Sequence, residues 1–209
     1  MYKVYLFIIL ICCKTTFTFS QQRVVAECTI EYKALLDSTS NKEEANALQN
    51  STKIVYIKGN DARTDLISNA FTQSVIYDKT NNLVTILREF GANKVLTKLT
   101  KTQWQEKNKK YEGYSLQNTS ETKNILGYSC TKAYLQTKEG LQILIYYTQS
   151  IVPSVKDFEY QFKDVPGFVL AYEIAEGDKK IFYTATKINL SPVQASKFTI
   201  PTSGYRILQ

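Results

Sequence analysis

Short segments in which apolar and polar residues alternate run through most of the chain after residue 23 and limit it to a β-rich fold. In residues 24–34 the even positions are apolar or aromatic, and all but one of the odd positions are polar. This period of two predicts a half-buried strand with Cys28 on its inner face. Further strands are predicted at 53–58, 63–68, 73–78, 83–90, 94–99, 128–136, 141–148, 168–174 and 180–190.

Helices are predicted at few places. Residues 101–112 form the clearest one, because Thr100 followed by Gln103 is a capping-box pattern. Trp104 and Tyr111 lie seven residues apart and are expected to share one helical face. A second, short helix is predicted from Ser191, where proline follows at the first helical position. Residues 37–52 fit either a short helix or a long hairpin connection.

The short spacings between strands favour antiparallel hairpins over crossover helices, so we expect a mainly β fold with few helices. Several strands are apolar on both faces. A curved sheet with a helix laid across it would enclose an apolar cavity, or else bury a filled core, and the residues leave both alternatives open. The candidates for a cavity wall are Trp104, Tyr111, Ile143, Ile145, Phe168, Leu170 and Tyr172.

The chain contains no histidine. Ser-His-Asp and Cys-His nucleophile pairs, histidine-based metal sites and histidine pH switches are therefore excluded. Acids and lysines are scattered without spacing typical of general acid-base catalysis. We expect no enzymatic activity, no catalytic residues, no metal site and no cofactor.

The N-terminus has the pattern of a secretory signal peptide, with a lysine at position 3 and an apolar stretch over residues 4–13. Thr18 and Ser20 suit a cleavage after residue 20. An alternative is a lipoprotein signal with Cys13 as the lipidated residue. We expect a signal peptide at 1–20, a single β-rich domain at 21–209 without a transmembrane span, and export to the periplasm or the outer membrane.

Cleavage after residue 20 would leave two cysteines, Cys28 and Cys130. In an oxidising compartment these are candidates for a disulfide bond. The alternative is two buried, unpaired thiols, since free cysteine packs as a small apolar residue.

Positive charge is concentrated in one region. The chain has a net charge of +7, and cleavage after residue 20 would remove Lys3 and Lys14. The excess charge that remains falls between Arg88 and Lys110. A basic helix beside the only tryptophan is a candidate for contact with anionic lipid headgroups or polysaccharide, and the alternative is a solvated helix face. The candidate residues are Lys101, Lys107, Lys109 and Lys110. Nucleic acid is not expected as a partner, because no nucleic-acid-binding module accompanies the charge.

Residues 165–173 (VPGFVLAYE) resemble the Leu-Pro-Gly-Leu-Ile signature of the GLPGLI family of exported Gram-negative proteins. Residues 56–63, 121–133 and 198–201 support the resemblance, which spans residues 24–208; Val165 and Phe168 replace the usual leucines. It implies a fold like the carriers LolA and LolB, an incomplete antiparallel β-barrel whose concave face is covered by helices. The family has no established catalytic residues.

These observations lead to two functional hypotheses. The first is a carrier-like envelope protein that binds an apolar or amphiphilic, lipid-like ligand; this step rests on fold analogy. The second is a structural or interaction protein with a filled core and no ligand, which uses its outer face and sheet edges to support another envelope protein.

Overall fold

The computed structural model describes residues 22–36, 51–176 and 179–208. The predicted signal peptide, Cys13 and the segment at 37–50 lie outside the described residues. More than half of the described chain is strand: β1 Arg23–Val25, β2 Glu27–Leu36, β3 Thr52–Lys58, β4 Asp61–Ile67, β5 Thr72–Asp78, β6 Leu83–Phe90, β7 Asn93–Thr100, β8 Ser115–Ile125, β9 Tyr128–Gln136, β10 Gln142–Thr148, β11 Ile151–Pro153, β12 Phe168–Glu176, β13 Lys179–Asn189 and β14 Arg206–Leu208.

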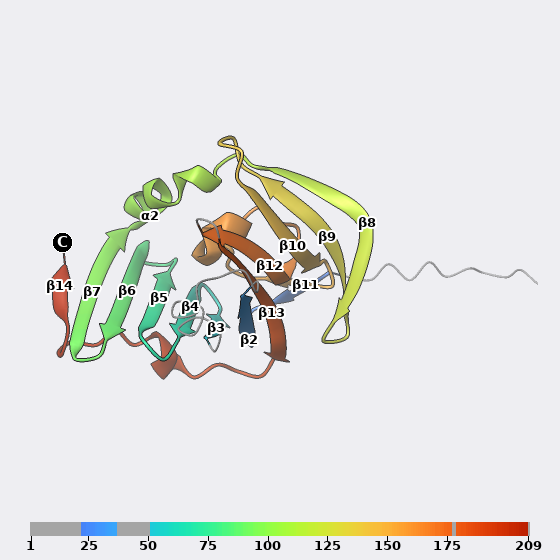
Figure 1. Ribbon diagram of the computed structural model, residues 1–209. Coiled ribbons are helices and arrows are strands. Elements are labelled where there is room, and N and C mark those ends of the chain that lie inside the picture. The colour runs from blue at the N-terminus through green and yellow to red at the C-terminus, as the bar shows by residue number, and fades with distance from the viewer. Residues whose placement is uncertain (1–21, 37–50, 177–178, 209) are drawn as a thin grey trace, which may run out of the picture.

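Twelve strands form one open sheet in the order β14-β7-β6-β5-β4-β3-β2-β13-β12-β10-β9-β8. Neighbours are antiparallel except β14, which pairs in parallel with β7. β1 and β11 form a separate parallel pair. Figure 1 shows the sheet curving strongly without closing. The predicted class, mainly β with a curved and incomplete antiparallel sheet, is confirmed.

The helical segments cover the concave side of the sheet. They are α2 Lys101–Lys107 and three 3-10 helices, η1 Lys109–Tyr111, η2 Asp157–Phe162 and η3 Ala195–Phe198. Figure 1 shows α2 at the rim after β7 and η2 within the curve of the sheet. η3 is the exception, since it lies beside β4 on the convex side with the C-terminal segment.

The predicted helix at 101–112 is confirmed at its start and ends early. Thr100 Oγ1 accepts from Gln103 N at 3.2 Å, and Gln103 Oε1 accepts from Thr100 N at 2.8 Å, which completes the capping box. The α-helix stops because the side chain of Asn108 donates to the carbonyl of Trp104 at 2.8 Å. Tyr111 therefore belongs to the separate helix η1.

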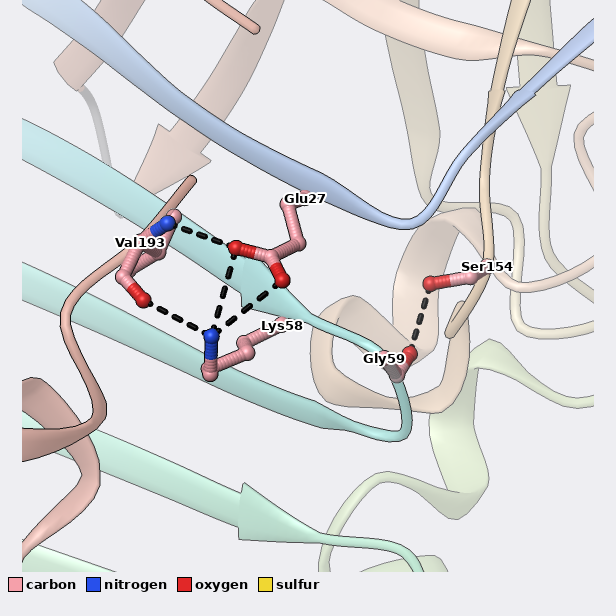
Figure 2. A network of polar contacts seen from close by, with 5 residues as sticks. All are labelled: Glu27, Lys58, Gly59, Ser154 and Val193. Carbon is pink, nitrogen blue, oxygen red and sulfur yellow. Dashed lines mark hydrogen bonds and ion pairs between the residues drawn. The ribbon is translucent and has the colours of Figure 1, made fainter. Parts of the chain in front are cut away.

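The helix predicted from Ser191 is wrong, since the helical turn begins only at Ala195. Val193 is instead held in a polar clamp drawn in Figure 2. Its N–H donates to Glu27 at 2.7 Å and its carbonyl accepts from Lys58 at 2.9 Å. The Val193 N–H and then Lys58 hold the pKa of the Glu27 carboxyl below its usual range. In the same view Ser154 donates to the carbonyl of Gly59 at 2.6 Å.

Two hydrophobic clusters lie on opposite faces of the sheet. The larger fills the concave side and includes the inner face of β2, where Cys28, Ile30 and Tyr32 are fully buried as the alternation predicts. The smaller one, around Ile76 and Leu87, is covered on the convex side by the C-terminal segment. The C-terminal segment thus packs across the convex face of the sheet.

Replacement of Gly167, in the Pro-Gly pair that precedes β12, should strongly reduce the stability of the protein. A Cβ at this position would lie 2.1 Å from the carbonyl oxygen of Thr148, a backbone atom of β10 that cannot move aside without breaking the sheet. Gly167→Ala should destabilise the protein by about 3 kcal/mol in urea unfolding. Gly127→Ala is the control, because its site is open and only its positive φ is strained, at about 1 kcal/mol. Equal losses for the two variants would contradict this account.

Candidate functional site

A pocket of about 190 Å³ lies on the concave side between the sheet, α2 and η2. Its wall is mixed, with seven apolar or aromatic residues and six polar or charged ones, among them one lysine and one glutamate. The lining residues are Lys53, Thr64, Leu66, Gln73, Val75, Trp104, Asn108, Phe158, Glu159, Gln161, Tyr172, Ile174 and Tyr183.

Strand register explains why these side chains meet. Lys53 of β3 lies opposite Leu66 of β4, which lies opposite Gln73 of β5. The next inward-facing row contains Thr64 and Val75. Cross-strand partners share one face of a sheet, so both rows point to the concave side.

The floor of the pocket is a buried ion pair. The Lys53 ammonium donates to the Glu159 carboxylate, and the two residues are only 5% and 9% exposed. Lys53 also donates to Tyr172 Oη at 2.7 Å and lies over the Tyr32 and Tyr172 rings at 5.1 and 4.7 Å. Paired charges of this kind are tolerated only because each one neutralises the other.

Burial and the Glu159 charge raise the pKa values of Tyr172 and Tyr32 well above the usual range. Both phenols therefore stay protonated at any physiological pH. Tyr32 uses its proton to donate to the carbonyl of Val169 at 2.9 Å, which ties β2 to β12 across the curve of the sheet.

η2 is held over the sheet by contacts from three directions. Trp104 Nε1 of α2 donates to the carbonyl of Asp157 at 3.0 Å, and Tyr77 of β5 donates to the Asp157 carboxylate at 3.3 Å. Tyr160 donates to Glu112 at 2.6 Å. Because these contacts hold η2 at its start and in its middle, the pocket beside it has a defined wall.

One hydroxyl in this wall lacks a partner. Thr64 Oγ1 is inaccessible to solvent and makes no hydrogen bond within the described part of the chain. Buried hydroxyls in folded proteins normally have a partner, so Thr64 is an exception in this wall.

The predicted cavity residues divide into two groups. Trp104 and Tyr172 line the pocket. Ile143, Ile145, Phe168 and Leu170 are buried in the packed concave cluster, against which the half-buried Tyr111 also packs. A filled core therefore occupies most of the concave side, and a small, open pocket remains beside η2.

The four predicted lysines, Lys101, Lys107, Lys109 and Lys110, are all exposed on α2 and η1. Lys109 pairs with Glu106 at 3.3 Å. Trp104 does not share their surface, because it is only 9% exposed and points toward η2. The expectation that Trp104 would lie beside these lysines at a membrane surface is therefore wrong.

The sequence did not reveal Lys53, Glu159 or the η2 segment. Lys53 carried a usable signal, since it occupies an inward position of a strand whose other inward residues, Val55 and Ile57, are apolar. A lysine there requires a buried partner. Glu159 lies among aromatic residues in a segment without strand or helix periodicity, so nothing in the sequence pointed to it as that partner.

Cys28 and Cys130 are free, buried thiols, which corrects the predicted disulfide and matches the alternative. They lie on β2 and β9, and three strands separate these in the sheet. Burial raises the pKa of Cys28 to about 12 and that of Cys130 to about 11, so neither thiol ionises near neutral pH.

Two larger hollows are less suited to a ligand. One of about 430 Å³ is polar, with hydroxyl and amide side chains such as Ser129 and Gln149. The other, of about 320 Å³, lies between β7 and the C-terminal segment, beside Lys98 and Tyr205. The pocket at Lys53 is the candidate because, unlike these two hollows, it contains a buried pair of opposite charges beside aromatic side chains.

Within the described ranges, no helix is long and apolar enough to span a bilayer. The same part of the chain contains no group of three or more His, Cys, Asp or Glu side chains placed to hold a metal ion.

No protein-family model and no curated protein matches the chain. Among solved structures it is similar to PNGF-II in the C2 space group, with a TM-score of 0.47 and 16% identity over 87% of this chain and 30% of that one. For PNGF-II in the P21 space group, the TM-score is 0.49 and the identity is 15%, over 88% of this chain and 32% of that one. The chain thus spans about a third of PNGF-II.

Two other structures are similar over most of their own length. A DUF1329 family protein from Desulfovibrio piger gives a TM-score of 0.37 at 7% identity, over 84% of this chain and 90% of that one. A β-barrel-like DUF1849 protein from Brucella abortus gives a TM-score of 0.40 at 10% identity, over 80% of this chain and 98% of that one. Likeness at this level carries no functional argument, and membership of the GLPGLI family stays a prediction.

The buried ion pair predicts strong coupling between its members. Lys53→Met should destabilise the protein by about 3–5 kcal/mol, because it leaves the Glu159 carboxylate buried without a counter-charge. Adding Glu159→Leu should restore most of that loss, as measured by urea unfolding followed through Trp104 fluorescence. Lys58→Met, at the half-exposed pair with Glu27, should cost much less than Lys53→Met, because solvent screens that pair. Additive losses in the double variant would refute the coupling.

Because the two cysteines are free and buried thiols, their reaction with an alkylating reagent should depend on unfolding. In the native protein at pH 8 without reductant, Cys28 and Cys130 should resist alkylation, because both are buried and protonated. In urea, still without reductant, both should be alkylated fully, as read by peptide mass mapping at the two positions. Full protection in urea that is relieved only by a reductant would instead establish a disulfide.

Proposed function

We propose that this protein is a carrier-like protein of the cell envelope that binds an apolar or amphiphilic, lipid-like ligand in the pocket beside η2, without catalysis. The observation that carries the proposal is the wall of that pocket. Leu66, Val75, Trp104 and Phe158 supply apolar surface around a charge-neutral ion pair. Apolar and aromatic side chains combined with placed polar groups are typical of small-molecule binding sites.

The volume of the pocket limits the ligand. A space of about 190 Å³ is about six times the ~30 Å³ that one water molecule occupies in the liquid. It is also below the ~300 Å³ at which pockets for drug-sized ligands begin. The proposed ligand is therefore a single alkyl chain or the end of one, and a two-chain lipid would have to leave most of its surface outside.

Binding without reaction is favoured by the chemistry of the wall. Lys53 and Glu159 are paired with each other, so neither is available as a free base or nucleophile unless the pair breaks. The absence of histidine from the whole chain removes the commonest proton-transfer group.

The proposed location follows from the sequence. The N-terminal pattern supports export to the periplasm or to the outer membrane, and the exposed lysines of α2 and η1 suit contact with an anionic lipid surface. Because Trp104 of α2 also lines the pocket, such contact would bring the pocket close to the membrane.

A second candidate function rests on β8. This eleven-residue strand is the last in the sheet, and most of its residues are exposed. Its free edge is suited to pairing with a strand of an envelope protein, which would make this chain a structural or interaction protein.

Lipid extraction and native mass spectrometry of the purified protein test the carrier proposal. Wild-type protein should carry a single-chain amphiphile, and Val75→Phe should lose it, because the larger side chain fills the pocket. Val24→Phe adds the same volume at an exposed position and should keep the ligand. A ligand-free wild type that also binds no added amphiphile would overturn the proposal, and crosslinking of β8 to a protein partner would then favour the second function.

A further inference from the structure

Arg88 lies on the concave face directly beside the pocket. It belongs to β6 and is the cross-strand partner of Gln73, which lines the pocket. Its Nε donates to Gln73 Oε1 at 2.8 Å. Lys53, Leu66, Gln73 and Arg88 therefore form one continuous row of inward-facing side chains across four strands.

The guanidinium of Arg88 has most of its hydrogen-bonding capacity free. It carries five N–H donors, and the bond to Gln73 uses one. Throughout the part of the chain that the structure describes, no carboxylate pairs with it. Arginines that are partly buried usually have an anionic partner, because desolvating an unpaired charge is costly.

The surrounding charges leave Arg88 as the source of positive potential at this end of the pocket. Lys53 and Glu159 neutralise each other. The nearest acid along β6, Glu89, is paired with Lys94 at 2.8 Å. A ligand that reached Gln73 would thus meet an apolar wall behind it and one uncompensated cation in front.

We propose that Arg88 binds the head group of the ligand and that this head group is a carboxylate or a phosphate on a single alkyl chain. The inference rests on the proposed carrier function and specifies its ligand class. The alkyl chain lies against Leu66, Val75 and Trp104, while the planar guanidinium offers two parallel N–H groups to the anionic oxygens. The Lys53–Glu159 pair stays intact in the complex, so an anion does not have to compete with Glu159.

Binding of three twelve-carbon probes to the purified protein tests the assignment. Dodecanoate, dodecyl phosphate and neutral dodecanol are titrated at pH 8 below their micelle-forming concentrations, with fluorescence of the single tryptophan, Trp104, as the signal. One or both anionic probes should bind about tenfold more tightly than dodecanol, as expected for a charge-assisted hydrogen-bond pair. A preference between the two anions identifies carboxylate or phosphate as the natural head group.

Variants at Arg88 separate the charge from the rest of the pocket. Arg88→Gln should abolish the preference for anions, so that the anionic probes bind no more tightly than dodecanol. Lys98→Gln is the matched control. It also removes one positive charge, but from the convex face of the sheet beside Tyr205, so this variant should keep the preference for anions. Arg88→Lys keeps the charge without the two-pronged geometry and should retain part of it.

Three results would overturn the inference: equal affinity for dodecanol and both anions, an anion preference that survives Arg88→Gln, or equal losses for Arg88→Gln and Lys98→Gln. If Arg88→Gln does not fold, the decision rests on Arg88→Lys and on whether salt weakens binding of the anions but not of dodecanol. Failure of all three probes to bind would count against the carrier function itself, whereas equal binding removes only the role of Arg88.

Discussion

The ion pair between Lys53 and Glu159 fastens the η2 segment to the concave face of the sheet, and the arrangement of that face depends on it. η2 is a short 3-10 segment with little backbone hydrogen bonding of its own, so contacts with its surroundings must fix its position. The aromatic side chains that enclose the pair, Tyr32, Tyr172 and Tyr183, come from three adjacent parts of the sheet. A polar contact thus determines where the apolar side chains pack.

The pocket follows from this arrangement. η2 and the large side chains of β10 and β12 fill most of the space under the curve of the sheet, and α2 closes the rim through Trp104. The space left between them is small, has both apolar and polar walls, and contains charges that cancel. A site of this kind selects a ligand by the width of the pocket and by the side chains at the edge of the pocket. At that edge Arg88 donates to Gln73.

Local patterns predicted the strands, the capping box at Thr100 and the inner face of β2, because each depends on neighbours within a few residues. The sequence missed β8, whose exposed polar residues lack alternation, and η2, whose conformation is set by partners 48 to 106 residues away. Of the pocket wall, Trp104 and Tyr172 were among the predicted residues as large apolar groups. Lys53, Glu159 and Thr64 were not, since their role depends on register and pairing that one strand alone does not contain.

The strand order also has a kinetic consequence. The two halves of the sheet, β2 to β7 and β8 to β13, are built mainly from neighbours along the chain and meet at one seam, where β13 pairs with β2. Closing that seam joins residues about 150 positions apart, and the entropy of closing so long a loop must be overcome before its contacts form. The seam, not either half, should therefore set the folding rate, as in other folds dominated by non-local pairing. Since η2 joins its lysine partner across the same seam, the pocket takes shape only when the last large step of folding is complete.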